Sequence, residues 1–202
     1  AALACLVRQA QQMDVFDQIV IVDDGSDPPI EADGGWSAPW SLPVNVLRNT
    51  ANAGPGAARN HALAHVTTDY LVYMDSDDAL APDFVRIWHA ARRQAFDLCL
   101  FRYHDTRRER VGCWGQMPQD DGIWRGAGLL GPGAAPLVHV DAGARADLAE
   151  TANYPWNKIY RTDLLRRHGI GCATSLVHQD IPLHWGALQH ADTVLASPLI
   201  GV

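Results

Sequence analysis

The sequence predicts an α/β fold in which a mostly parallel sheet is flanked by helices. Three observations support it: short runs of β-branched residues, helical patterns between these runs, and acidic clusters directly after two of them. Because ligands of such sheets bind beyond the carboxyl ends of the strands, the position of the acidic clusters is the first indication of function.

The first half of the chain alternates between the two kinds of element. Residues 3–13 carry apolar side chains at helical spacing, and Ile19 to Val22 is a continuous β-branched run typical of a strand covered on both faces. Pro55 stands where a helix begins. The further elements expected are a strand at 44–47, a helix at 57–66, a strand at 70–74, a helix at 82–94 and a strand at 97–103.

The second half is less regular. Glycines are frequent between residues 104 and 150, which predicts loops, a short edge hairpin near residues 123–124 and a helix at 144–149. Helices are expected again at 162–168 and 179–188. With no internal repeat and no linker, residues 1–202 are predicted to form one domain with two halves, 1–103 and 104–202.

Composition excludes several classes of protein. Hydrophobic residues make up 48% and charged residues 19%, as in ordinary globular proteins, so disorder is not expected. The 16 basic and 23 acidic residues give 16 − 23 = −7, a charge that disfavours nucleic acid and anionic membranes as partners.

Cysteines and hydropathy indicate a soluble protein of a reducing compartment. The four cysteines form no C-x-x-C pair, which argues against a zinc cluster and a dense disulfide framework. No apolar run of about 18 residues and no basic leader occur, so we expect no signal peptide and no membrane-spanning helix. We therefore expect a cytoplasmic location, with any contact to the inner face of the membrane made through an acceptor, a partner or terminal sequence that is not part of these 202 residues.

The acidic clusters are candidates for cation and ligand binding. Asp75-Ser76-Asp77-Asp78 places carboxylates at a strand end, where they suit Mg²⁺ or Mn²⁺ bridging to a nucleoside diphosphate. An acidic turn followed by a helix N-cap explains the same residues without a metal. Asp23-Asp24-Gly25-Ser26 also has the composition of a turn, but two acidic strand ends in one sheet repel unless a ligand offsets the charge.

A stretch of small residues precedes the helix expected at 57–66. Asn52-Ala53-Gly54-Pro55-Gly56 allows a close backbone approach, and Arg59 lies one turn further on. Helix N-termini favour phosphate, so this stretch is a candidate phosphate contact. A simple Gly/Pro break before an ordinary helix is the alternative.

Together these segments resemble the nucleotide-binding half of the family 2 glycosyltransferases, inverting enzymes of the GT-A fold. The family pattern is a strand with V-D-D-G-S, then R-N, N-x-G-x-x-x-A-R-N and a strand ending in D-x-D-D, and the sequence has each piece in order. The runs W-N-K-I-Y-R at 156–161 and H-Q-D-I-P-L-H-W at 178–185 resemble segments of bacterial members that build surface polysaccharides.

The resemblance implies transfer of a hexose from a nucleotide-sugar, by family frequency a UDP-sugar, to an acceptor hydroxyl of a polysaccharide or glycolipid, with Mn²⁺ or Mg²⁺ as cofactor. Residues 1–103 would bind the donor and residues 104–202 the carbohydrate or lipid-linked acceptor. The implied roles are base recognition for Asp24 with support from Asp23, nucleotide contact for Arg59, ribose and metal contact for Asp75, metal binding for Asp77 and general base for Asp180. Contacts with acceptor or diphosphate are expected for Asp78, Trp156, Asn157, Lys158, His178 and Gln179.

The sequence departs from the family pattern in two places. Gln179 replaces the glutamate before the base, which predicts altered acceptor recognition. The apolar first strand that the family carries ahead of the opening helix is missing from the sequence. A catalytically degenerate member that binds nucleotide or acts as a scaffold is therefore the alternative function.

Two other chemistries are weaker alternatives. His178 and His184 stand six residues apart, which does not fit the spacing of a zinc site on a helix. A phosphatase of the haloacid dehalogenase type needs a threonine two residues after its second aspartate, whereas Ala79 stands there.

Overall fold

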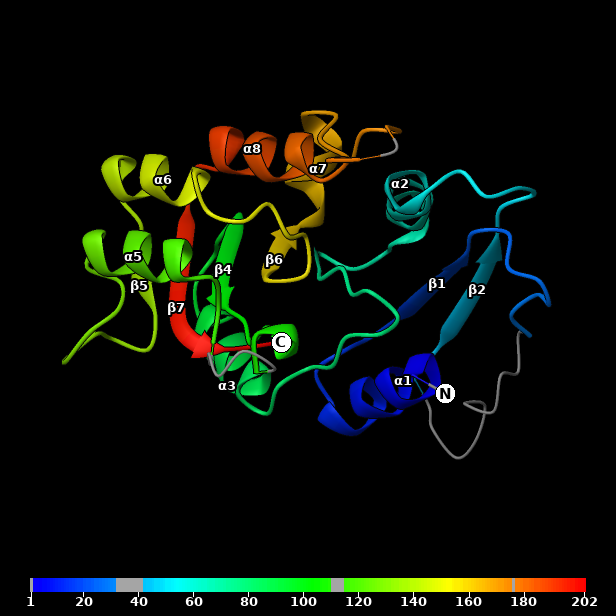
Figure 1. Cartoon of the computed structure of the whole chain (residues 1–202), viewed down its shortest axis with the longest axis horizontal. Helices are drawn as coiled ribbons and strands as arrows, with labels where there is room; N and C mark the ends of the chain where they lie inside the picture. The colour runs from blue at the N-terminus through cyan, green and yellow to red at the C-terminus, as the bar shows by residue number, and fades with distance from the viewer. Residues whose placement is uncertain (1, 32–41, 110–114, 176) are drawn as a thin grey trace.

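The computed structural model describes residues 2–31, 42–109, 115–175 and 177–202. Its elements form an α/β arrangement with a two-stranded and a five-stranded sheet, drawn on the right and left of Figure 1. The strands are β1 (Ile19–Asp23), β2 (Val44–Arg48), β3 (Tyr70–Leu71), β4 (Leu98–Arg102), β5 (Val138–His139), β6 (Lys158–Arg161) and β7 (Val194–Ile200). The helices are α1 (Ala2–Met13), α2 (Pro55–His65), α3 (Asp83–Ala91), α4 (Thr106–Glu109), α5 (Pro118–Gly126), α6 (Ala142–Ala149), α7 (Thr162–Arg167) and α8 (Ile181–His190).

The small sheet confirms the prediction that residues 19–22 and 44–47 form strands. β1 and β2 pair in parallel, from Ile19 beside Val44 to Asp23 beside Arg48. Helix α1 packs its apolar side on this pair through Val7, which is 2% exposed and contacts Ile21. The acidic pair that ends β1 is therefore held at the carboxyl edge of a parallel ladder.

The large sheet is mixed, so the prediction of a mostly parallel sheet is wrong. Its strand order is β3-β6-β4-β7-β5, and only β4 and β7 pair in parallel. β6 runs antiparallel to both β3 and β4, and β5 runs antiparallel to β7. The physical reason is the connection: β5 and β6 enter the sheet from the long irregular segment of the second half, and antiparallel pairing needs no crossover helix.

Three local expectations also change. The segment expected as an edge hairpin is helix α5, which begins at Pro118 and buries Trp124 on one side. β7 was not predicted, although it lies in the core of the large sheet. The strand expected at 70–74 forms a ladder only over β3, because residues 72–74 extend beyond the end of its partner β6.

Helices cover the large sheet on both faces. On one face Leu98, Leu100 and Tyr160 pack with side chains of α7 and α8, and on the other Cys99, Phe101 and Ile159 pack with side chains of α3. Within the described residues, no helix is long and apolar enough to cross a membrane.

Candidate functional site: a carboxylate-lined donor pocket

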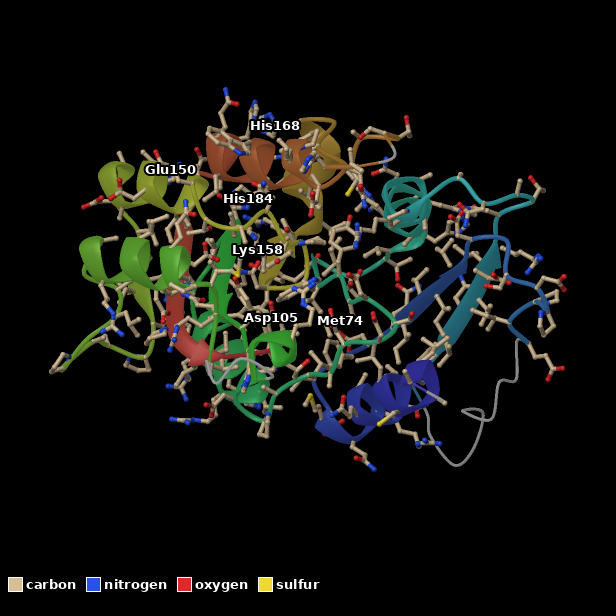
Figure 2. The ribbon with its side chains drawn as sticks, in the orientation of Figure 1. Met74, Asp105, Glu150, Lys158, His168 and His184 are labelled. Carbon is tan, nitrogen blue, oxygen red and sulfur yellow. The ribbon has the colours of Figure 1, made fainter. Side chains whose placement is uncertain are left out.

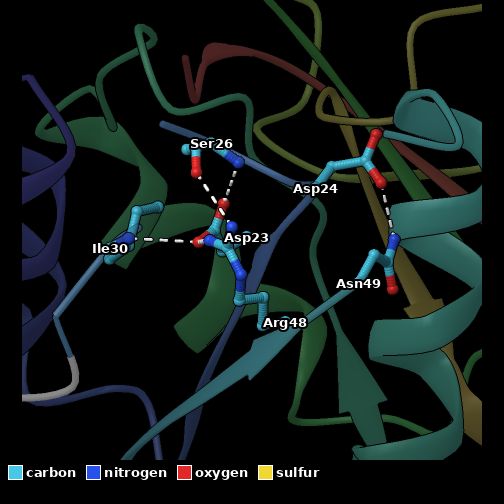
Figure 3. Close-up of polar contacts among 6 residues, drawn as sticks. All are labelled: Asp23, Asp24, Ser26, Ile30, Arg48 and Asn49. Carbon is cyan, nitrogen blue, oxygen red and sulfur yellow. Dashed lines mark hydrogen bonds and ion pairs between the residues drawn. The ribbon is translucent and has the colours of Figure 1, made fainter. Parts of the chain in front are cut away.

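Asp23 organises the loop that follows β1. Its carboxylate is 1% exposed and accepts hydrogen bonds from the backbone N–H groups of Ser26 (2.8 Å) and Ile30 (3.0 Å) and from the Arg48 guanidinium (Figure 3). Burial alone would raise the pKa of Asp23, but these hydrogen bonds and the charge of Arg48 lower it to about 2. The side chain therefore carries a full negative charge that the protein itself neutralises, which suits the supporting role expected for it.

Asp24 joins the end of β1 to the start of α2. Its carboxylate accepts hydrogen bonds from the Asn49 side-chain amide (2.6 Å, Figure 3) and from the backbone N–H groups of Ala53 (3.1 Å) and Gly54 (2.8 Å). Burial opposes ionisation, yet these donors lower the pKa of Asp24. The Asn49 Oδ1 in turn accepts a hydrogen bond from the His61 Nδ1 at 2.7 Å, so both ends of the amide are held. Asn49 is the asparagine of the R-N pair in the family pattern, although it was not among the predicted site residues.

Gly56 allows the loop before α8 to approach α2. A Cβ added at Gly56 would lie 2.1 Å from the Ala173 carbonyl oxygen and 2.9 Å from the Gln179 Cβ. Only glycine fits such a distance, because real side chains need more than 3 Å. The small residue at the entrance of α2 therefore allows Ala173 and Gln179 to lie against the first turn of that helix.

Arg59 forms an ion pair with Asp75, the first carboxylate after β3. The Arg59 Nη2 and the Asp75 Oδ1 are 2.6 Å apart, and the guanidinium is mostly buried whereas the carboxylate is 40% exposed. Burial lowers the pKa of Arg59, but Asp75 and the more distant Asp180 raise it above its ordinary value. Arg59 is therefore charged, and its Nη2 contacts the Asp75 carboxylate.

The remaining carboxylates of the second acidic cluster are open to solvent to different degrees. Asp77 is exposed, and Asp78 is partly buried. Burial, and then the charges of Asp75 and Asp77, raise the pKa of Asp78 to about 6. Such mutual repulsion is what a divalent cation would relieve.

The carboxylate ligands fit a cation whose coordination shell is completed by the substrate. Among the described residues, no three His, Cys, Asp or Glu side chains already converge on one point. Mg²⁺ and Mn²⁺ are commonly held by one or two carboxylates together with substrate phosphates, so Asp75 and Asp77 are sufficient protein ligands for a metal that arrives with a diphosphate.

One cavity of about 650 Å³ brings most of the predicted donor residues together. At its polar end, the wall contains Asp23, Asp24, Arg59, Asp75, Asp77 and Gln179. These residues come from the ends of β1 and β3, from the first turns of α2 and from the loop before α8. Segments that are far apart in the sequence thus meet at one edge, as expected for a ligand site in an α/β protein.

Asp180 occupies the N-cap position of α8. Its side chain makes no capping hydrogen bond, so the carboxylate is not used to satisfy the helix N-terminus. Asp180 does not line the cavity, whereas the residue before it, Gln179, does. His178, the residue before that, is exposed and has a φ of 57°, which turns the chain sharply into the helix.

Trp156, Asn157 and Lys158 lie in the core and not on the cavity wall. Trp156 is 9% exposed and stacks on Tyr154 with ring centroids 4.5 Å apart. The Lys158 ammonium is fully buried and donates to the Tyr154 carbonyl and to the Asn157 side-chain oxygen, each at 2.6 Å. Burial lowers the pKa of Lys158 to about 7. Their contact with substrate stays a prediction, and their visible role is to hold the segment 154–158 in place.

A buried polar cluster beside Lys158 had no signal in the sequence. Asp120 is 4% exposed and accepts hydrogen bonds from the Tyr103 hydroxyl (2.9 Å) and the Ala152 backbone N–H (3.1 Å). His184 is fully buried, and burial lowers its pKa to about 3, so it stays neutral. Figure 2 shows Lys158 and His184 inside the molecule and His168 on its outer side.

The fold and the aspartates that follow β1 and β3 define an α/β protein with an acidic ligand site at the ends of its strands. The model of the family described as "Glycosyl transferase family 2" matches residues 1–123, and the chain belongs to that family. The resemblance seen in the sequence is thereby confirmed.

Relatives agree with this assignment. YibD of Escherichia coli (strain K12), described as an uncharacterized glycosyltransferase, is 27% identical over 167 residues, which are 81% of this chain and 45% of YibD. A poly(ribitol-phosphate) beta-glucosyltransferase of Bacillus spizizenii is 25% identical over 87 residues, 43% of this chain and 14% of that protein. The chain spans less than half the length of either relative.

A solved structure shares the fold. The crystal structure of S. aureus TarS residues 1–349 in complex with UDP-GlcNAc superposes with a TM-score of 0.74 and 20% identity, over 98% of this chain and 53% of that one. At this identity the likeness shows that the α/β fold is the same.

Proposed function

We propose that residues 1–202 form a GT-A domain of a metal-dependent, inverting glycosyltransferase. It moves a hexose from a UDP-sugar to a hydroxyl group of a polysaccharide or glycolipid acceptor. The observation that carries the proposal is the polar end of the cavity, where Asp24, Arg59, Asp75 and Asp77 line one wall. Membership of the family supports the reaction type. The UDP-GlcNAc bound to TarS and the polymer named for the Bacillus relative support the choice of donor and acceptor.

Each donor-side residue has a task that its environment permits. Asp24, held by Asn49 and by the α2 backbone, presents an ionised carboxylate that can accept hydrogen bonds from a nucleotide base. Arg59 and Asp75 face the same space as a fixed ion pair, able to contact phosphate and ribose hydroxyls. Asp75 and Asp77 would hold the divalent cation, whose chemistry is to neutralise charge on the departing diphosphate.

Asp180 is the general base of this proposal. An inverting transfer needs one base that takes the acceptor proton on the face opposite the leaving group. The Asp180 carboxylate makes no capping hydrogen bond to α8, and the adjacent Gln179 lines the cavity. We assign the acceptor side to residues 104–202, because α8 and the aromatic segment 154–156 both belong to it.

The donor site is tested by thermal unfolding with UDP or GDP, each with and without Mn²⁺. Saturation at 100 times Kd stabilises a protein by about 2.7 kcal/mol, or about 5 to 10 °C for a chain of this size. We expect this shift only when UDP and Mn²⁺ are both present. Asp77→Asn should abolish the Mn²⁺-dependent part, whereas Asp83→Asn, a carboxylate outside the cavity, should leave it unchanged. A Mn²⁺-dependent shift in unfolding temperature that is unchanged in both variants would refute the metal assignment.

The general base is tested separately from binding. Asp180→Asn should lower sugar transfer from UDP-GlcNAc, or hydrolysis of that donor, by at least about 100-fold, because removal of a general base costs this much or more. The unfolding shift with UDP and Mn²⁺ should persist. A wild-type chain that binds UDP with Mn²⁺ but is as slow as Asp180→Asn would favour the degenerate nucleotide-binding function, for which the neutral Gln179 already argues.

A further inference from the structure

Two side chains behind Asp24 extend the hydrogen bonds of the donor pocket. The Asp24 Oδ1 accepts from the Asn49 Nδ2 at 2.6 Å (Figure 3), and the other end of that amide lies 2.7 Å from the Nδ1 of the His61 ring. Asp24 lines the cavity, whereas Asn49 and His61 do not. Any effect of His61 on the base of a bound nucleotide therefore has to pass through Asn49 and Asp24.

The charge of Asp24 fixes the direction of both hydrogen bonds. An ionised carboxylate only accepts, so the part of the Asn49 amide that faces Asp24 is its NH₂ group. The Asn49 Oδ1 then faces His61, and because two acceptors would repel, the His61 Nδ1 carries a proton. The ring therefore donates to Asn49 whether His61 is neutral or charged.

Asn49 is the one donor to Asp24 that can turn away. The other donors to this carboxylate among the described residues are the backbone N–H groups of Ala53 and Gly54, which are fixed at the entrance of α2. The Asn49 backbone is fixed as well, because its N–H donates to the Asp23 carbonyl at 2.9 Å. Its side chain, however, is only partly buried, so an amide without a second partner can rotate toward water.

His61 supplies that second partner from the second turn of α2. It thereby connects three elements, since Asp24 follows β1, Asn49 follows β2 and His61 belongs to the helix that comes next. The hydrogen bond from His61 keeps the Asn49 oxygen turned away from Asp24 and the Asn49 NH₂ group turned toward it. The direction in which Asp24 can accept from a ligand therefore depends on His61.

We infer that His61 is a positioning residue for recognition of the nucleotide base. It holds Asn49, and Asn49 orients the Asp24 carboxylate that accepts from an N–H group of the base. The inference rests on the donor site proposed above and concerns the base alone. The diphosphate and the cation are assigned to Arg59, Asp75 and Asp77.

Three variants of α2 separate the hydrogen bond from the packing of the ring. His61→Phe removes the donor and keeps an aromatic ring, whereas His61→Asn keeps an N–H donor at about the place of the imidazole Nδ1. Histidine, phenylalanine and asparagine have similar helix propensities, so the stability of the helix is matched. The control is His65→Phe, one turn further on, where the ring lies edge-on to His61 with 5.3 Å between centroids.

Calorimetry with two ligands, UDP and pyrophosphate, each with Mn²⁺, measures the effect on the base. Pyrophosphate offers the phosphates without the base. We expect His61→Phe to weaken UDP binding about three- to tenfold, the value of one hydrogen bond, and to leave pyrophosphate binding unchanged. His61→Asn should recover most of the affinity for UDP, and His65→Phe should match the wild type. An equal loss for both ligands in His61→Phe, or no loss for UDP, would overturn the inference.

NMR titration of the Asp24 carboxyl group tests the same contacts without a nucleotide. Burial raises the pKa of Asp24, and the Asn49 hydrogen bond is the first of the contacts that lower it. His61→Phe should therefore raise this pKa, and His61→Asn should not. A wild-type chain that binds neither ligand would refute the donor site and, with it, the role in base recognition. Normal UDP binding together with an unchanged Asp24 pKa in His61→Phe would overturn the inference alone.

Discussion

At the scale of single residues, Asp23 links the stability of the domain to pH. Its pKa in the folded protein is about 2, below the ordinary value of 3.8. A lowered carboxylate pKa stabilises the fold at pH values above the unfolded pKa, and this contribution is lost as the pH falls from about 4 to 2. The difference corresponds to about 2 kcal/mol.

We therefore expect Asp23→Asn to lower the free energy of unfolding by about 2 kcal/mol at pH 7, or roughly 4 to 8 °C in Tm. The variant should also lose part of the acid-side slope below pH 4. Urea unfolding at pH 7 and pH 3 measures both effects. Asp17→Asn, in the turn before β1, serves as the control carboxylate. A variant whose stability falls equally at the two pH values would contradict the linkage to ionisation.

At the scale of elements, the contact between α2 and the loop before α8 decides whether the two halves of the site meet. Gly56→Ala places a Cβ against the Ala173 carbonyl oxygen and Gln179. Overpacking of this kind costs about 1 to 3 kcal/mol, and it should displace the first turn of α2, to which we assign contacts with the donor.

We expect Gly56→Ala to lower Tm and to weaken the stabilisation by UDP with Mn²⁺. Gly122→Ala is the matched control, since that glycine lies in α5 with nothing within 4 Å of an added Cβ. There the substitution should be neutral or raise stability by up to about 1 kcal/mol. If the two variants behave alike in thermal unfolding, the close approach at Gly56 is unimportant.

At the scale of the whole molecule, the two sheets differ in how well they are buried. β4 runs through the centre of the large sheet, and Leu98 to Phe101 are all 0% exposed. In the cluster beside β1, only Val7 and Ile21 are buried among the described residues, with partly buried neighbours around them. Burial of apolar area is the main source of stability, so the small sheet should open more readily.

Native-state hydrogen exchange should show this difference. We expect the amides of Ile21 and Leu47 to exchange through a lower-energy opening than those of Leu100 and Leu195, and to be less sensitive to added denaturant. Simultaneous exchange of both sheets at every denaturant concentration would instead mean that they unfold as one unit.

Much of the first half followed from the sequence alone, because its signals are local. The run Ile19 to Val22, the proline at residue 55 and the acidic ends of two strands each predict an element or a ligand edge from neighbours along the chain. The same signals carried the family resemblance, which the match over residues 1–123 confirms. Local periodicity and turn chemistry are therefore enough to identify an α/β protein of this class.

Tertiary structure decided what depends on contacts between distant segments. The antiparallel insertion of β6, the unpredicted β7 and the burial of Lys158 with Asp120 all follow from pairing and packing that sequence spacing does not encode. The approach of Gln179 to Gly56 is likewise a contact across 123 residues of chain. Because strand pairing depends on the burial of whole faces of a sheet, the strand order and the cavity between residues 19–24 and 70–77 are seen only in the folded chain.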